Sequence, residues 1–438
     1  MSNVFLAVAL LGALMTANAF VSQRRFPKLI VPGFFAGWLV SELPLHQIAW
    51  QALATLVFVA TGALDAWTGW LGLFVTFTSW GGLLALIPMA HRAAAVTESA
   101  LCDALGTGYG EGWSPATLQS MQTPPLAGRH LWAFKMRHPN VKVTRDIPYV
   151  DDGNRRHMLD LYAPKKLRDD MTPAPVLLQI HGGGWVIGSK KEQGLPLMNL
   201  MAARGWLCVA VNYRLSPKAT FPDHLVDVKR AVKWIREEIH NHGGDPNFIV
   251  ATGGSAGGHL SSLLALTAND PVYQPGFESV DTTMNGCVPF YGVYDFTDHY
   301  QFLGNERRIE LLQKLVLKKN LETDRDAFLQ ASPMHRIHSD VPPMYVIHGD
   351  QDSLVPVEEA RQFVRLLRES SKSPVAYAEI PGAQHAFDIF HSPRNSIVTE
   401  SVARFLSTLY SDSQLGRTTP TTIPTATTGA GVTQGTRP

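Results

Sequence analysis

Hydrophobic and polar residues divide this 438-residue chain into three zones. The first zone, residues 1–92, is apolar and almost uncharged. Its longest apolar runs, at 4–21, 48–64 and 69–90, come close to the roughly 20 apolar residues that a membrane-spanning helix needs. We therefore predict a transmembrane helical region of three or four spans at the beginning of the chain.

The number of spans depends on residues 29–40, a shorter apolar run that contains Pro32 and Gly33. This run is either a fourth span, extended through Leu45, or a re-entrant segment. Tryptophans near the ends of the apolar runs suit the headgroup region of a bilayer, where amphipathic rings are favoured. They are Trp38, Trp50, Trp67 and Trp70.

Two other interpretations of the first zone are weaker. A buried helical bundle of a soluble protein would carry polar stripes, which these runs lack. The first run could be a signal peptide, because Ala17-Asn18-Ala19 resembles a cleavage site, but no Lys or Arg precedes it and more apolar runs follow. We therefore expect a multi-pass protein of the cell membrane whose first helix is retained.

Positive charges bear on the orientation of these helices. Arg24, Arg25 and Lys28 lie in the first loop and favour a cytoplasmic position for it. Three spans would then place the rest of the chain inside the cell, and four would place it outside. The sequence leaves both the number of spans and the side open.

The second zone, residues 93–410, alternates short apolar runs with amphipathic stretches of helix length. Expected strands lie at 176–180, 207–211, 248–251, 286–290, 344–347 and 375–380, and expected helices at 224–240, 259–268 and 357–369. Such alternation is typical of a mostly parallel sheet with helices on both faces. The predicted fold class is therefore α/β, with a helical cap.

Domain boundaries follow from the same pattern. Residues 93–140 do not fit the alternation and are assigned to a linker or cap segment, whereas 141–410 form the α/β domain, with a further cap insertion at about 291–340. The third zone, 411–438, is rich in Thr, Gly and Pro and has almost no large apolar residue. It is expected to be a disordered tail.

Composition excludes several classes of function. The formal net charge is +1, and no basic run indicates nucleic acid as a partner. The three cysteines, Cys102, Cys208 and Cys287, are scattered and lack C-x-x-C spacing, so we expect small buried side chains. None of the 16 histidines belongs to an H-E-x-x-H motif. We predict neither a metal site nor an organic cofactor.

The stretch Gly253-Gly254-Ser255-Ala256-Gly257 carries the clearest chemical signal. It follows an expected strand and precedes an expected helix. Small residues around a serine at such a turn are typical of a nucleophile elbow, in which the sharp turn lifts the hydroxyl out of the sheet. Ser255 is therefore the candidate nucleophile for acyl transfer.

A second glycine-rich stretch, H-G-G-G-W starting at His181, directly follows the first of the buried strands. Glycines let backbone N–H groups approach a substrate, so the amides of Gly182 and Gly183 are candidates for an oxyanion hole. The amide of Ala256 would be the third donor. His181 is expected to anchor the loop.

Two later loops supply candidates for an acid and a base. Asp352 follows a late strand, at the sheet edge where parallel strands build active sites, and Asp350 is its rival. Asp350 would otherwise be a turn residue. His385 follows the last expected strand, and His391 is the alternative base. With Ser255, these residues stand in the chain order nucleophile, acid, base.

These motifs resemble those of the hormone-sensitive-lipase-type branch of the α/β-hydrolases. The matching stretches are H-G-G-G-W, G-x-S-A-G-G, H-G-D-x-D, P-G-x-x-H and the segment from Asn212 to Pro217, within residues 140–410. An apolar beginning with a Thr/Pro-rich tail is similar to the membrane-associated Lip esterases of mycobacteria. The resemblance implies an esterase or lipase with a Ser–Asp–His triad and a cap built from the N-terminal part and an insertion.

One residue departs from the pattern of that branch. An acidic residue usually precedes the nucleophile, and here the position is Gly254. The elbow should still form, because glycine tolerates any backbone angle. The hydrogen bonds that the acid normally makes to nearby loops are absent, so a looser site or a different loop arrangement would follow.

The sequence therefore predicts hydrolysis of an acyl ester through an acyl-enzyme intermediate. The expected membrane location favours a small-molecule or lipid ester as substrate. Transfer of the acyl group to an alcohol or lipid acceptor uses the same intermediate and stays an alternative. A non-catalytic membrane protein with a hydrolase fold is less favoured, because no member of the triad is missing.

Overall fold

A computed structural model of the chain describes residues 1–21, 27–123, 128–166, 172–302 and 306–416. The strands are β1 (Val141–Pro148), β2 (Met158–Pro164), β3 (Ala174–Ile180), β4 (Leu207–Val211), β5 (Gly244–Gly254), β6 (Gly286–Phe290), β7 (Met344–Gly349) and β8 (Val375–Ile380). The helices are α1 (Ser2–Asn18), α2 (Ile30–Glu42), α3 (Pro44–Ala60), α4 (Trp67–His91), α5 (Ala93–Leu105), α6 (Pro115–Met121), α7 (Leu195–Ala203), α8 (Asp223–Glu238), α9 (Ala256–Leu266), α10 (Glu306–Leu311), α11 (Arg325–Ala331), α12 (Val357–Ser370) and α13 (Pro393–Gln414).

All eight strands form one sheet in the order β1-β2-β4-β3-β5-β6-β7-β8. The strands from β3 to β8 run parallel to one another, whereas β2 is antiparallel to β4 and β1 is antiparallel to β2. The predicted mostly parallel α/β sheet is confirmed. The antiparallel edge formed by β1 and β2 was not predicted, because its outer strand is largely exposed and lacks a continuous apolar run.

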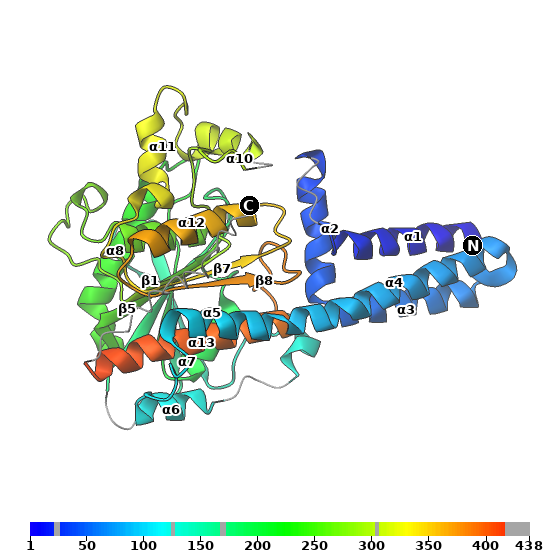
Figure 1. Ribbon diagram of the computed structural model, residues 1–438, viewed down its shortest axis with the longest axis horizontal. Helices are drawn as coiled ribbons and strands as arrows, with labels where there is room; N and C mark the ends of the chain where they lie inside the picture. The colour runs from blue at the N-terminus through cyan, green and yellow to red at the C-terminus, as the bar shows by residue number, and fades with distance from the viewer. Residues whose placement is uncertain (22–26, 124–127, 167–171, 303–305, 417–438) are drawn as a thin grey trace, which may run out of the picture.

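Alternate residues of the central strands face two separate cores. Val176, Leu178 and Ile180 of β3 pack in a core with α8, α9 and α12, whereas Leu177 packs in a core with α5, α7 and α13. Successive side chains of a strand point to opposite faces, so a strand that is buried on both faces must be almost wholly apolar. Helices therefore cover both faces of the sheet (Figure 1).

The first zone forms four helices, and α1, α3 and α4 project side by side from the α/β domain, whereas α2 stands between them and the domain (Figure 1). Among the described residues, one continuous helical stretch, Trp67–Leu105, is long and apolar enough to cross a membrane. Helices α2 and α3 pass the same test only together, and they are bent by 97° at their junction. Helix α1 is apolar but shorter. The transmembrane region thus stays a prediction.

Two boundaries differ from those expected. Helix α5, in the segment assigned to a linker or cap, packs against β8 and α13, so it covers the sheet. Helix α13 continues to Gln414, beyond the expected end of the domain at 410, and Leu409, Tyr410 and Ser411 near its end are buried against the domain. The predicted disordered tail lies, from residue 417 onward, outside the described residues.

Candidate active site

Ser255 occupies the turn between β5 and α9. Its backbone φ is +59°, in the left-handed region that costs energy for a residue with a side chain. The turn is held by a 3.0 Å hydrogen bond from the Ser255 N–H to the carbonyl of Phe290. At Gly257 a Cβ would lie 2.1 Å from the carbonyl oxygen of Ile180, so only glycine fits there. The serine therefore sits at the beginning of α9, where the helix dipole is positive.

Asp352 and His385 meet beyond the ends of β7 and β8. His385 Nδ1 and Asp352 Oδ2 are 2.7 Å apart, and Asp352 Oδ1 accepts the N–H groups of Leu354 and Val355 at 2.8 and 2.9 Å. Burial of Asp352 would by itself raise its pKa, but the adjacent His385 and His348 bring the pKa well below its usual range. Asp352 is therefore ionised at neutral pH and oriented by four contacts.

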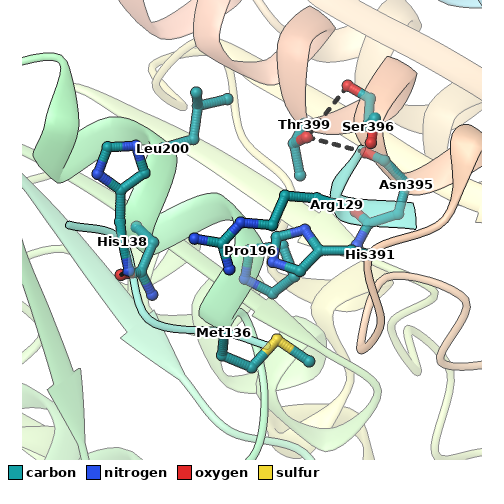
Figure 2. Close-up of a pocket in the computed structure, with 10 residues that line it drawn as sticks. Arg129, Met136, His138, Pro196, Leu200, His391, Asn395, Ser396 and Thr399 are labelled. Carbon is teal, nitrogen blue, oxygen red and sulfur yellow. Dashed lines mark hydrogen bonds between the residues drawn. The ribbon is translucent and has the colours of Figure 1, made fainter. Parts of the chain in front are cut away.

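The rival acid and the rival base have other partners. Asp350 Oδ1 accepts the N–H of Gly382 at 2.7 Å, as a turn residue does, and burial raises its pKa. His391 lies in a separate pocket beside Arg129, as Figure 2 shows. Burial, with a contribution from Arg129, lowers the pKa of His391 to about 4. The geometry thus pairs Asp352 with His385.

Ser255 and His385 line one cavity of about 510 Å³. The hydrogen bonds of the described residues do not include one between Ser255 Oγ and His385 Nε2. Such catalytic hydrogen bonds often become short only when substrate binds. The catalytic roles of the two residues stay a prediction.

The glycine-rich loop after β3 reaches the same cavity, which Gly183 lines. The N–H of Gly182 donates to Gln193 Oε1 at 2.6 Å, so in this structure it is engaged by a side chain that no sequence motif marks. Within the described part of the chain, the amides of Gly183 and Ala256 have no hydrogen-bond partner. The N–H groups of Gly183 and Ala256 are therefore available to donate hydrogen bonds to an oxyanion. The N–H of Gly182 would be available only if Gln193 moved.

His181 supports this loop from behind. Its Nδ1 lies 2.7 Å from the carbonyl oxygen of Gly182, and its ring stacks on Tyr213 with centroids 4.4 Å apart. Burial lowers the pKa of His181 to about 4, so the ring is neutral at physiological pH. These contacts agree with an anchoring role.

Tyr291 accounts for the glycine that precedes Ser255. A Cβ at Gly254 would lie 2.5 Å from Tyr291 Oη and 2.8 Å from the ring. Tyr291 donates its hydroxyl to the buried Asp388, and its ring centroid lies 4.5 Å from that of His385. An aromatic ring from the loop after β6 therefore fills the space of a side chain at 254 and packs against the candidate base.

Helix α2 forms one wall of the cavity. Its lining side chains are Ile30, Val31, Phe34, Phe35 and Trp38. Trp38 Nε1 donates to the carbonyl of Ala386 at 2.8 Å, and the ring of Phe34 meets His385 edge to face at 6.2 Å. Trp38, which the sequence placed at a membrane interface, thus contacts the loop that carries His385.

A buried ion pair fixes α2 to this loop. Glu42 and Arg394 are almost fully buried and form a salt bridge. Ser392 Oγ donates to Glu42 Oε2 at 2.7 Å, and Arg394 Nε donates to the carbonyl of Pro381 at 3.2 Å. The end of α2 is thereby tied to the chain on both sides of the base.

The predicted cap insertion supplies another wall. Arg307, Arg308 and Leu311, on α10, line the cavity. Arg308 is held by a 2.7 Å ion pair with the buried Glu359 of α12. The cavity is therefore enclosed by the first zone of the chain and by the insertion, and none of the described residues between 93 and 140 lines it.

Comparisons with known proteins identify relatives of this chain. Residues 159–367 match the family model described as BD-FAE. The chain is 42% identical over 419 residues to a Mycobacterium tuberculosis protein named "Probable carboxylic ester hydrolase LipM", and the alignment covers 94% of each chain. It is 38% identical over 390 residues to Esterase LipQ of the same organism, with 86% of this chain and 85% of LipQ covered. The solved structure of propionate-bound esterase Est2 from Thermogutta terrifontis aligns with a TM-score of 0.50 and 26% identity over 65% of this chain and 97% of Est2.

Proposed function

The chain belongs to the carboxylic ester hydrolase family of the mycobacterial Lip esterases and is a serine esterase, and we propose that Ser255, His385 and Asp352 carry out the reaction. The observation that supports this proposal most strongly is the shared cavity of Ser255 and His385. The imidazole of His385 is held from behind by an ionised carboxylate at 2.7 Å. A serine on an elbow and a base held by an acid are the parts that acyl transfer needs.

In the proposed mechanism, His385 Nε2 takes the proton of Ser255 as the Oγ attacks the ester carbonyl carbon. The negative charge that forms on the carbonyl oxygen is stabilised by the amides of Gly183 and Ala256. His385 then gives the proton to the leaving alcohol, and an acyl-serine remains. Water, deprotonated by His385, attacks the acyl-serine and releases the acid. Asp352 stays ionised and stabilises the imidazolium in both halves of the reaction.

Paired variants test these assignments. Ser255→Ala, His385→Gln and Asp352→Asn should each lower kcat for p-nitrophenyl butyrate by about 10⁴-fold or more. Ser261→Ala, His391→Gln and Asp350→Asn are the matched controls from the same elements, and they should keep most of the activity. If the Asp350 or His391 variant lost activity while its counterpart did not, the proposed acid or base would be wrong.

We also propose that the ester carries an apolar acyl or alcohol part. Most residues around the cavity are apolar or aromatic, and Val31, Phe35 and Ile187 are at least 43% exposed at its edge. A volume of about 510 Å³ lies within the usual range for small-molecule sites. An apolar wall beside the nucleophile favours a hydrocarbon chain over a polar group.

Membrane attachment through α1, α3 and α4 is part of the same proposal. These helices expose large apolar side chains that water does not favour, among them Leu14, Leu56, Trp70 and Phe74 at 60% or more. Helix α2 does not belong to this group, because it packs on the catalytic domain and carries the buried Glu42. We therefore propose three spans, formed by α1, α3 and α4, with α2 as a wall of the active site.

A further inference from the structure

A cluster of exposed aromatic and aliphatic side chains follows α6, at the short 3₁₀ turn Arg129–Trp132 and the residues after it. Leu131, Trp132 and Phe134 are 57%, 71% and 65% exposed. Between them Ala133 is buried against Leu43 and Phe390, so this segment is held on the domain while its large side chains face outward. Tryptophan and phenylalanine that project in this way are typical of a surface that meets a membrane interface.

Positive charge surrounds these side chains. The sequence from Glu111 to Asp146 contains no acidic residue between its ends, and its basic residues are Arg129, Lys135, Arg137, Lys142 and Arg145. Arg129, Lys135, Arg137 and Lys165 line one depression of about 490 Å³ together with Trp132. Within the described part of the chain, no carboxylate pairs with any of these four. In a protein of net charge +1, this is a local excess of positive charge.

Arg129 gives the segment its shape. Its guanidinium donates to the backbone carbonyls of Lys135 and Arg137, which closes a turn around it. Figure 2 shows its side chain next to His391, in the neighbouring pocket that His138 also lines. Burial and the charge of Arg129 lower the pKa values of both histidines. Burial is the larger cause, and the smaller contribution of Arg129 is the effect that a nearby positive charge has on a histidine.

The cluster lies where the apolar helices leave the domain (Figure 1). His46, at the beginning of α3, contacts the carbonyl of Leu131 at 3.2 Å, and Phe134 packs on Phe390 at 5.1 Å. Helix α3 then runs away from the domain beside α4. If α3 and α4 enter a bilayer, Leu131 and its neighbours lie at the level of the headgroups.

We propose that Arg129, Leu131, Trp132, Phe134, Lys135, Arg137 and Lys165, here named the basic collar, bind the anionic headgroup layer of the membrane. The apolar side chains enter the interface, and the basic side chains contact lipid phosphates. This inference rests on the proposed membrane attachment and adds a lipid-binding surface to it. Each Lys or Arg close to an anionic surface strengthens binding roughly fivefold.

Depth measurements on the full-length protein test the collar. A spin label is placed at Trp132→Cys in a Cys102→Ser background, because Cys102 is partly exposed whereas Cys208 and Cys287 are buried. The protein is reconstituted in nanodiscs of phosphatidylcholine, with or without phosphatidylglycerol. We expect the label to be at headgroup depth in the anionic discs, judged by oxygen against nickel-chelate accessibility, and to move toward water in the neutral discs.

Charge reversal provides the decisive comparison. Lys135→Glu with Arg137→Glu should return the label to water in anionic discs, and high salt should do the same. Lys318→Glu with Lys319→Glu, at exposed positions after α10, is the matched control and should leave the depth unchanged. Two results would overturn the proposal. One is a label that stays in water in both kinds of disc, and the other is a label depth that changes neither with the lipid charge nor with the charge of the collar.

Two further arms separate this inference from its alternatives. Inorganic phosphate added to neutral discs should not move the label; if it reproduced the effect of phosphatidylglycerol, the site would bind a free anion and the membrane proposal would be wrong.

Hydrolysis of soluble p-nitrophenyl butyrate by the collar variants should match that of the parent. Ser255→Ala should abolish hydrolysis without changing the depth of the label, so failure of the proposed chemistry is distinguishable from failure of the collar.

Discussion

Gly254 and Tyr291 occupy one volume beside the nucleophile, and this explains why the position before Ser255 carries no side chain. The ring of Tyr291 fills the space and also packs on His385. The sequence shows the glycine but not its reason, because the two residues are far apart along the chain and no local pattern connects them. Gln193, which engages the amide of Gly182, escaped prediction for the same reason.

A double-mutant cycle tests this shared volume. Gly254→Ala should reduce kcat/KM by at least about tenfold and destabilise the fold by about 1–3 kcal/mol, because the added Cβ overlaps the Tyr291 ring. In a Tyr291→Ala background the same substitution should cost much less, for the ring is gone. Kinetics and thermal melting of all four proteins measure the coupling, and additive losses would show that the two residues do not compete for space.

Buried histidines should make the stability depend on pH. Burial lowers the pKa values of His181 and His224 to about 4 and that of His259 to about 3. The unfolded chain binds protons at these residues below about pH 6.5, whereas the folded protein does not until about pH 4, so stability is full above pH 6.5 and is lost as the pH falls.

The expected slope in this window is about 1.4 kcal/mol per pH unit for each such histidine. Melting temperatures measured from pH 7 to pH 5 should therefore fall, and His224→Gln should make the decrease shallower. His338→Gln, at an exposed position, serves as the control and should leave the slope as it is. A flat profile in the parent protein would contradict the assignment of these histidines as neutral in the folded state.

Among the elements, α2 differs most from its expected place. From its apolar sequence we predicted either a membrane span or a re-entrant segment. In the structure, α2 lines the active-site cavity. Hydrophobicity alone does not distinguish a lipid-facing helix from one that packs on a protein. The contacts that decide the matter, Trp38 with Ala386 and Glu42 with Arg394, join residues more than 300 positions apart.

Substrate preference should therefore depend on α2. Phe34→Ala enlarges the cavity next to His385, so the preference for p-nitrophenyl esters should shift toward longer acyl chains. The ratio of kcat/KM for a longer ester to kcat/KM for the butyrate should rise roughly tenfold, which is the size of the effect of one or two methylene groups. Leu56→Ala, on the outer face of α3, removes a comparable side chain away from the cavity and should leave the profile unchanged. If the parent protein, Phe34→Ala and Leu56→Ala all had the same dependence of kcat/KM on acyl-chain length, α2 would not contact the acyl chain.

The strands and helices of the α/β domain were the most predictable part of the fold. Strands β4 and β6 have the expected bounds, because parallel strands buried on both faces are short and apolar throughout. Strand β8, at one edge of the sheet, also has the expected bounds, although it includes the half-buried Tyr377 and Glu379. The antiparallel strands β1 and β2 and helix α5 lack a continuous apolar run. Their structure depends on packing against residues distant in the chain.

In the whole molecule, the proposed three spans and the proposed basic collar predict one orientation. Arg24, Arg25 and Lys28 follow α1, and α1 ends on the side of the catalytic domain (Figure 1). Positively charged loops are retained in the cytoplasm, so the catalytic domain should face the cytoplasm. The sequence left this open because the number of spans was undecided.

Cysteine accessibility in intact cells measures this orientation. A cysteine at Leu415, after α13, should react with a membrane-impermeant maleimide only after the cells are lysed, whereas one at Thr61, between α3 and α4, should react in intact cells. The Cys102→Ser protein without new cysteines provides the background. The opposite pattern would place the catalytic domain outside, which requires either an even number of spans or a first loop that lies outside the cell.

The central claim is that Ser255 is the nucleophile, and peptide mass spectrometry after reaction with a fluorophosphonate probe tests it most directly. We predict that the probe modifies Ser255 alone, that the peptide containing Ser255 carries one phosphonate, and that Ser255→Ala abolishes both labelling and ester hydrolysis. Stoichiometric labelling of another serine, or an unlabelled and fully active Ser255→Ala protein, would contradict the account.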